Sequence, residues 1–201
     1  IICALSFAVL AWVGTEIYLT APPIPTQVIS TEGKVLFSEG QVQHGQQSWL
    51  SAGGQQLGSV WGHGSYVAPD WSADWLHREA LALRNIWAQR EHGQAFENLS
   101  VGQQAELNGR LKAEMRHNTY DAATNTITLS PDRAEAVAIV ADHYVRLFGT
   151  DSGLDALREQ YAMSAGTLPD PKDLKSLPAF IFWSAWSAAT DRPGEIDLSY
   201  T

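Results

Sequence analysis

The chain has 201 residues, of which 45% are hydrophobic, and a formal net charge of −9. This length is sufficient for one domain with its own core. Its 13 lysines and arginines are scattered without a run, which argues against nucleic acid as a partner. The single cysteine, Cys3, excludes an intrachain disulfide, a cysteine-based zinc site and haem attachment through a CxxCH motif.

The N-terminal segment predicts a membrane anchor. Residues 1–13 carry no charge, but a bilayer span needs about 20 residues, so we interpret residues 1–20 as the C-terminal part of a first transmembrane helix. A cleaved secretory signal is the alternative, although no clear small-x-small cleavage site follows. No lysine or arginine precedes Lys34, and positive charge near a span favours the cytoplasmic side. Residues after about 20 are therefore expected outside the cytoplasm, beginning with a stiff proline-rich spacer at 21–27.

The first half of the following domain alternates turn signals with apolar periodicity. The pattern predicts, in chain order, a hairpin over 28–37 turning at Glu32-Gly33, a helix from the cap Ser38 to about Ala52, and a glycine- and aromatic-rich loop over 60–71. Asp70 is expected to cap the longest helix, over about 71–91. Its inward face is predicted from the spacing of Leu76, Ala80, Leu83 and Trp87.

The second half adds further helices and one hairpin. We expect a capping box of Ser100 and Gln103 on a helix to about Arg116, a hairpin over 120–129 around Asn125, a helix from Ser130-Pro131, a short helix over 154–163, and a buried apolar helix over 177–189. The helix after Ser130 shows four inward residues at helical spacing, namely Val137, Val140, Tyr144 and Leu147. The fold class predicted is mainly α with small β-hairpins.

No motif in the chain indicates a self-sufficient active site. The six histidines show no metal-ligand spacing such as HExxH, and the hydroxyl residues form neither GxSxG nor SxxK. The segment 53–58 is rich in glycine but lacks the GxGxxG order. We therefore assign no catalytic residue to this chain.

Several blocks of sequence resemble one family. WGHGSYVAPDWSADWLHREA at 61–80 is similar to a signature of quinol-dependent nitric oxide reductases, and further blocks agree in order at 117–121, 143–148, 179–186, 190–194 and 199–201. The resemblance implies a single-chain bacterial relative of the haem-copper oxidases, which reduces two NO to N₂O with electrons from quinol. Its catalytic haem b and non-haem iron would lie in membrane helices outside this chain. Residues 28–201 would then be a haem-free, cytochrome c-like domain on the periplasmic side of the cytoplasmic membrane.

The same resemblance implies which features were lost and kept. Gly54, Gln55, Gln56, Leu57 and Gly58 stand where the cytochrome c relative carries its CxxCH haem motif, so this chain is expected to bind no cofactor by itself. By the motif, the carbonyl of Gly64 and the hydroxyl of Tyr66 would contribute to a calcium site completed by other residues. The alternative is that Gly64 and Tyr66 only pack on the membrane domain.

The partners implied are the membrane domain of the same polypeptide, the lipid bilayer and quinol. The expected interface residues are Trp61, His63, Trp71, Trp183 and Trp186. For Trp71 and Trp183, ordinary core packing is an equal alternative, and for His63 the alternative is a solvent-exposed side chain. Two other functions stay open: a membrane-anchored extracytoplasmic sensor or ligand-binding domain, and an electron carrier that still holds a haem.

Overall fold

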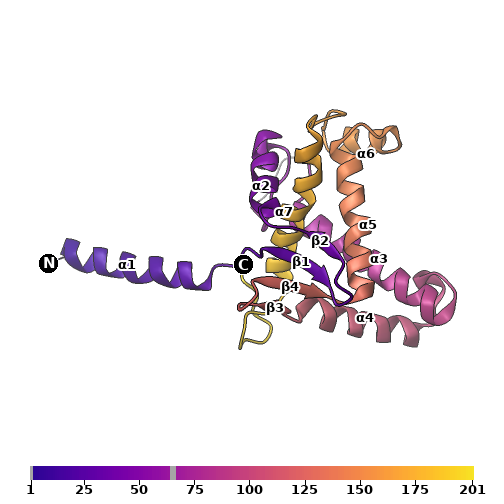
Figure 1. Ribbon diagram of the computed structural model, residues 1–201, viewed down its shortest axis with the longest axis horizontal. Coiled ribbons are helices and arrows are strands. Elements are labelled where there is room, and N and C mark those ends of the chain that lie inside the picture. The colour runs from indigo at the N-terminus through magenta and orange to yellow at the C-terminus, as the bar shows by residue number, and fades with distance from the viewer. Residues whose placement is uncertain (1, 64–66) are drawn as a thin grey trace.

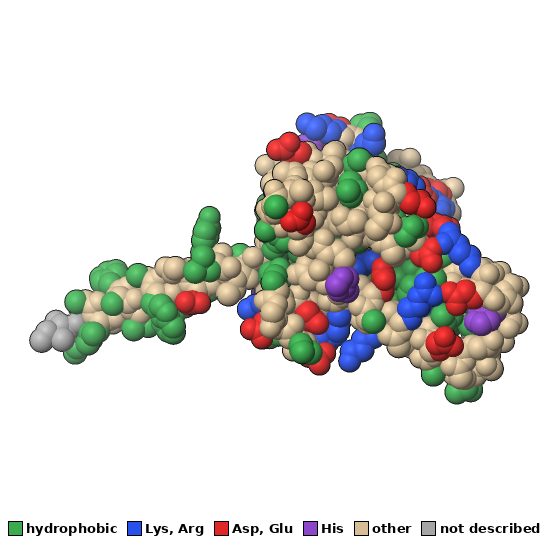
Figure 2. Space-filling view, turned by 60° about the horizontal axis from the view of Figure 1, so that its bottom comes forward, with side chains coloured by type: hydrophobic (Ala, Val, Ile, Leu, Met, Phe, Trp, Pro, Cys, Tyr) green, Lys and Arg blue, Asp and Glu red, His purple; other side chains and the backbone are tan. Residues whose placement is uncertain are grey.

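The computed structural model describes residues 2–63 and 67–201. Helix α1 (Ile2–Thr20) extends away from the rest of the chain and has no buried residue. Figure 2 shows apolar side chains projecting from both edges of this helix. In the described chain it is the one helix whose length and hydropathy are sufficient to cross a membrane.

The described part of the domain forms one small sheet. Its strands are β1 (Gln27–Ser30), β2 (Val35–Phe37), β3 (Tyr120–Asp121) and β4 (Thr126–Leu129), in the order β2-β1-β4-β3. Both predicted hairpins are confirmed, and a parallel pairing of β1 with β4 joins them into one sheet. Val28 and Ile127 face each other in this pairing and are both buried, so the sheet contributes to the core.

Helices make up most of the remaining domain (Figure 1). They are α2 (Gln41–Ser51), α3 (Trp71–His92), α4 (Val101–Arg116), α5 (Pro131–Phe148), α6 (Asp155–Gln160) and α7 (Pro171–Ala189), with short 3-10 turns η1 (Gly54–Gln56), η2 (Phe96–Asn98) and η3 (Ser152–Leu154). The apolar half of α7 lies at the centre and packs against α2, α3 and α5. Gly45 permits the closest of these approaches, because a Cβ there would lie 2.2 Å from the carbonyl oxygen of Ser176.

Local capping signals were mostly correct. The side chain of Asp70 caps α3, the Ser100–Gln103 capping box begins α4, and Ser130 caps α5. The prediction that Ser38 caps α2 was wrong. Gly40 holds the N-cap position at a φ of 78°, and Ser38 instead donates hydrogen bonds to the side-chain oxygen of Gln41.

The inward face of α3 differs from the predicted one. Leu83 and Trp87 are buried as expected, but Leu76 and Ala80 are only partly buried. The buried stripe instead contains Trp71, Trp75, Glu79, Leu83 and Trp87. The prediction placed the stripe on the wrong residues because it considered apolar positions alone, and the buried face includes the acidic residue Glu79.

Candidate docking site around the loop before helix α3

Asp70 organises the described part of the loop. One carboxylate oxygen accepts hydrogen bonds from the Ser59 hydroxyl at 3.0 Å and the Gly62 amide at 2.6 Å. The other accepts from the Ser72 hydroxyl at 2.7 Å and the Ala73 amide at 3.0 Å. Burial would raise the pKa of Asp70, but these hydrogen bonds outweigh it and hold the pKa below its ordinary value.

Trp61 connects this loop to α7. Its backbone has a φ of 57°, and its amide donates to the Ser72 hydroxyl at 2.8 Å. The indole N–H donates to the carbonyl of Ser184 at 2.9 Å, and the ring lies 5.6 Å from the ring of Trp183. A non-glycine residue at positive φ is held by its surroundings, so these contacts fix the position of the indole.

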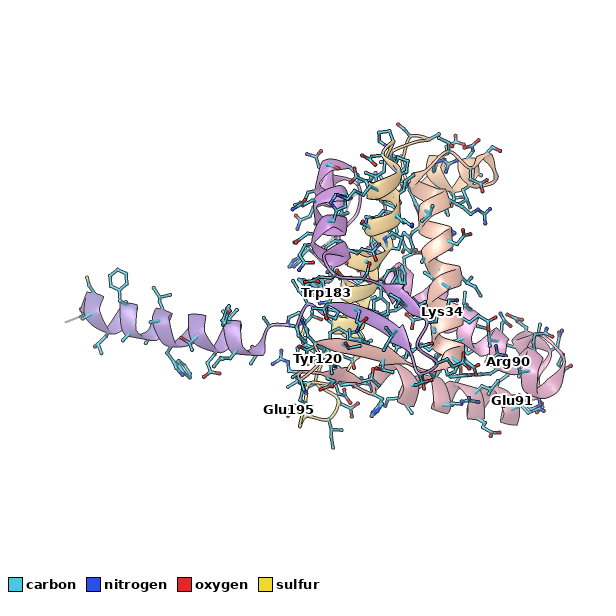
Figure 3. All side chains as sticks on the ribbon, in the orientation of Figure 1. Lys34, Arg90, Glu91, Tyr120, Trp183 and Glu195 are labelled. Carbon is cyan, nitrogen blue, oxygen red and sulfur yellow. The ribbon has the colours of Figure 1, made fainter. Side chains whose placement is uncertain are left out.

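Trp183 connects α7 to the segment that follows α1 (Figure 3). Its indole N–H donates to the carbonyl of Pro23 at 2.8 Å, and only 8% of the residue is exposed. The amide of Thr26 also bonds the carbonyl of Asn125, at 2.8 Å. The proline-rich segment is therefore bound to the domain, and Trp61 and Trp183 form a continuous bridge from the loop to that segment.

The C-terminal residues reach the same part of α7. The amide of Tyr200 donates to the carbonyl of Ser187, which is four residues after Trp183 and thus about one helical turn, or 6 Å, further along. The Tyr200 ring also packs against that of Trp186, with centroids 5.5 Å apart. The segment from α1 and the C-terminal segment therefore approach the domain on one side, as Figure 1 shows.

The other expected interface residues differ in exposure. His63 is exposed, which leaves it accessible to a partner. Trp71 and Trp186 are 0% and 1% exposed and belong to the main core. They have no surface to present to another domain, so core packing accounts for them and the expectation of an interface role does not hold for either.

Residues 54–58, which the resemblance matches to a haem motif, lie directly against the aromatic core. Gly54 and its neighbours form the turn η1, and Gly58 follows at a φ of 138°. A Cβ on Gly58 would lie 2.2 Å from the indole nitrogen of Trp71. The Trp71 ring is in turn enclosed by Tyr144, Phe148 and Tyr161, with centroids 5.4 to 5.9 Å away. Aromatic side chains thus fill the interior behind this segment.

The predicted calcium ligands Gly64 and Tyr66 lie outside the described residues. Within 2–63 and 67–201, no group of three or more His, Cys, Asp or Glu side chains is placed to hold a metal ion. Asp70 is the carboxylate nearest in sequence to the predicted ligands, and its two oxygens already accept four hydrogen bonds.

A buried ion pair is the main polar feature that the sequence analysis missed. Arg133 donates from Nε to Glu79 at 2.8 Å, and Trp75 donates its indole N–H to the other Glu79 oxygen at 2.8 Å. Both charged residues are 1% exposed. The sequence does contain a signal for this pair: Glu79 lies four residues after Trp75 and four before Leu83, within an otherwise apolar stripe.

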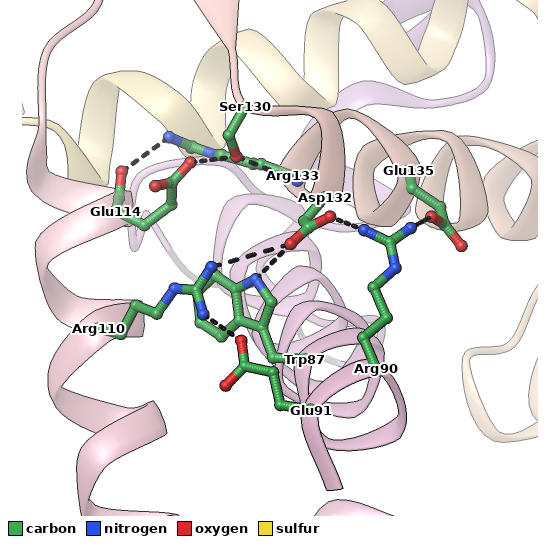
Figure 4. A network of polar contacts seen from close by, with 9 residues as sticks. All are labelled: Trp87, Arg90, Glu91, Arg110, Glu114, Ser130, Asp132, Arg133 and Glu135. Atoms are coloured by element: carbon green, nitrogen blue, oxygen red, sulfur yellow. Dashed lines mark hydrogen bonds and ion pairs between the residues drawn. The ribbon is translucent and has the colours of Figure 1, made fainter. Parts of the chain in front are cut away.

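Arg133 also belongs to a wider network between α3, α4 and α5 (Figure 4). Its guanidinium donates to the Glu114 carbonyl at 3.1 Å. Nearby, the Trp87 indole N–H donates to Asp132 at 2.8 Å, and the guanidinium of Arg110 stacks 4.1 Å from the Trp87 ring centroid. Each of these charges has an opposite charge or a backbone group as its partner, so the network stabilises the contact of three helices.

The structure defines a class of protein: a mainly helical domain with a small four-stranded sheet, preceded in the chain by one apolar helix. The family model for the NorB cytochrome c-like domain of nitric oxide reductase matches residues 25–201, and the chain belongs to this family. A comparison with curated proteins gave no match. The family indicates a membrane-associated protein, and the length and composition of α1 fit either a membrane anchor or a signal sequence.

Proposed function

We propose that this chain is the haem-free, extracytoplasmic domain of a quinol-dependent, single-chain nitric oxide reductase. In this proposal α1 is a membrane helix, and the domain contributes structure rather than chemistry. The reduction of two NO to N₂O takes place at haem b and a non-haem iron in the membrane part of the enzyme. The quinol reacts there as well.

The replacement of the haem motif carries the proposal. A cytochrome c-like domain that transfers electrons needs two thiols and a histidine around its haem, and residues 54–58 supply none of them. The close approach of Gly58 to the Trp71 indole supports the same conclusion, because the neighbouring space is filled by protein. Electrons must then enter the enzyme by another route, and a membrane-soluble quinol is the donor that needs no periplasmic haem.

The bridge from the loop through Trp61 and Trp183 to Pro23 supports a docking role. It binds the loop to the segment that leaves α1, through the hydrogen bonds of two indole N–H groups. The loop and the segment that leaves α1 are thus held on the same part of α7. Trp61 and His63 are the side chains from this loop that we propose contact the membrane domain.

We also propose that Gly64 and Tyr66 contribute oxygen ligands to a calcium ion at that interface. Oxygen donors suit this cation, and the glycine carbonyl is unobstructed by a side chain. The Tyr66→Phe variant removes the hydroxyl and keeps the ring. Bound calcium in the intact enzyme should fall in this variant, whereas an unchanged calcium content would exclude the ligand role.

The choice of electron donor tests the function. Membranes that contain the intact protein should consume NO when supplied with a reduced quinol, and should not do so with reduced cytochrome c. Membranes from cells that lack the protein provide the control. NO consumption with cytochrome c alone would contradict the proposal, and a lack of NO consumption with either donor would favour a sensor or ligand-binding function.

A further inference from the structure

The loop over 192–199 presents apolar side chains on the side of the domain where α1 leaves. Ile196 is 86% exposed and Leu198 is 47% exposed. Figure 3 places Glu195, their neighbour, at the edge of the domain near Tyr120, on the side from which α1 extends. The function proposed above makes no use of these two residues.

The loop is firmly built. The amide of Arg192 donates to the carbonyl of Leu198 at 2.8 Å and closes the base of the loop, while the amide of Glu195 donates to the carbonyl of Arg192 at 3.0 Å. The guanidinium of Arg192 donates to the carbonyl of Tyr200 at 3.2 Å. The exposed residues therefore lie on a closed loop with a defined attachment to the domain.

The charged side chain between Ile196 and Leu198 reaches back toward the domain, although 63% of it stays exposed. Asp197, the charged residue between the two aliphatic ones, has a φ of 59°. Its carboxylate is drawn back to Arg116 at 2.9 Å and lies 3.9 Å from Lys112. A non-glycine residue in this conformation is held at a cost in free energy. Here the conformation pairs the charge with the domain and leaves Ile196 and Leu198 exposed.

The short connection to α1 limits how far this side of the domain lies from a membrane. Helix α1 ends at Thr20, and Pro23 is already bound to Trp183. Three residue steps of at most about 3.5 Å each limit the distance from the end of the helix to the domain to about 10 Å. Tyr200, at the base of the loop, contacts α7 only one turn from Trp183. If α1 crosses a bilayer, the loop must lie close to its surface.

We propose that Ile196 and Leu198 insert into the interface of the lipid bilayer beside α1. They would form a second point of contact, which fixes the tilt of the domain on the membrane. Aliphatic side chains at the boundary of headgroups and acyl chains gain free energy by leaving water. The inference rests on the proposed role of α1 as a membrane anchor.

An environment-sensitive fluorophore at position 196 tests this proposal. The intact protein, with Cys3→Ser and with any cysteine outside residues 1–201 also replaced by serine, is given Ile196→Cys, labelled with NBD and reconstituted into phosphatidylcholine vesicles. The matched control is Val101→Cys with the same label. Val101 is 84% exposed and begins α4, at the end of the domain away from α1. Both substitutions are on the surface, so circular dichroism should show the same fold for both.

The expected result is a blue-shifted emission at position 196 that is quenched by doxyl-labelled lipid and protected from aqueous iodide. The label at position 101 should be quenched by iodide. Equal iodide quenching at both positions would overturn the proposal. Protection at position 196 from both quenchers would also overturn it, because a protein surface and not lipid would then cover the loop. Carbonate extraction of vesicles reconstituted with the chain over residues 1–201, without the membrane part of the enzyme, tests the anchor separately. Release of this chain refutes anchoring by α1, whereas its retention, together with a water-exposed label in the intact protein, refutes only the lipid contact.

Discussion

The buried pair of Glu79 and Arg133 gives the sharpest test of the packing. The Glu79→Leu substitution removes the acceptor of the Arg133 guanidinium and of the Trp75 indole N–H at once. Arg133 would keep its bond to the Glu114 carbonyl and no longer have a counter-charge. Because it is 1% exposed, water cannot replace that counter-charge.

The expected loss is large. Removing one partner of a buried ion pair costs about 3 to 5 kcal/mol, and the unsatisfied Trp75 donor adds about 1 kcal/mol or more. A domain of this kind is stable by about 5 to 15 kcal/mol, so Glu79→Leu removes a considerable part of the total. Arg133→Met should have an effect of similar size, because it leaves the Glu79 carboxylate buried without a cation.

The double variant Glu79→Leu with Arg133→Met separates charge from packing. It leaves no unpaired charge, so its free energy of unfolding should lie only about 1 to 2 kcal/mol below that of the parent. Urea unfolding of the protein in mild detergent, followed by circular dichroism, measures all three variants. A loss below about 1 kcal/mol in both single variants, or a double variant that loses the sum of the two, would refute this reasoning.

Two further predictions concern one glycine and one histidine. Gly58→Ala should destabilise the domain by about 2 to 4 kcal/mol, because the residue has a φ of 138° and the added methyl group would overlap the Trp71 indole. Gly33→Ala is the control: Gly33 has a φ of 82° and open space around it, so this substitution should cost about 1 kcal/mol. Equal losses in thermal unfolding would argue against the close approach of Gly58 to Trp71. Burial first, and then the charge of Arg78, lowers the pKa of His143 to about 4. The unfolded chain therefore binds the additional proton between about pH 6.5 and 4, and stability should fall by about 1 to 2 kcal/mol as the pH is lowered through this range, after allowance for partial exposure. A His143→Gln variant with the same pH slope would contradict this.

Local signals in the sequence predicted local structure well. Asp70, Ser100 with Gln103, and Ser130 each cap the predicted helix, because a cap depends on groups within three residues of it. The parallel pairing of β1 with β4 was not predicted. It joins segments that are far apart in sequence, and neither strand carries a pattern that identifies its partner.

The sequence predicted which residues belong to the site better than it predicted how they are arranged. The sequence identified the loop before α3 and the tryptophans, but a large amphipathic side chain is equally suited to a core and to an interface. Only the fold distinguishes Trp71 and Trp186, which are buried, from Trp61, which bridges to Trp183. The pairing of Glu79 with Arg133 depends on how α3 and α5 pack, and the spacing along either helix does not reveal it.

The central claim is that this cytochrome c-like domain has lost its haem. Peroxidase staining after denaturing electrophoresis, combined with the pyridine haemochrome spectrum of the purified chain over residues 1–201, tests it most directly. A chain with a single cysteine, located in α1, should show neither a stained band nor the absorption of a c-type haem. A stained band at the size of this chain, or a Soret band that stays with it after denaturation, would contradict the account.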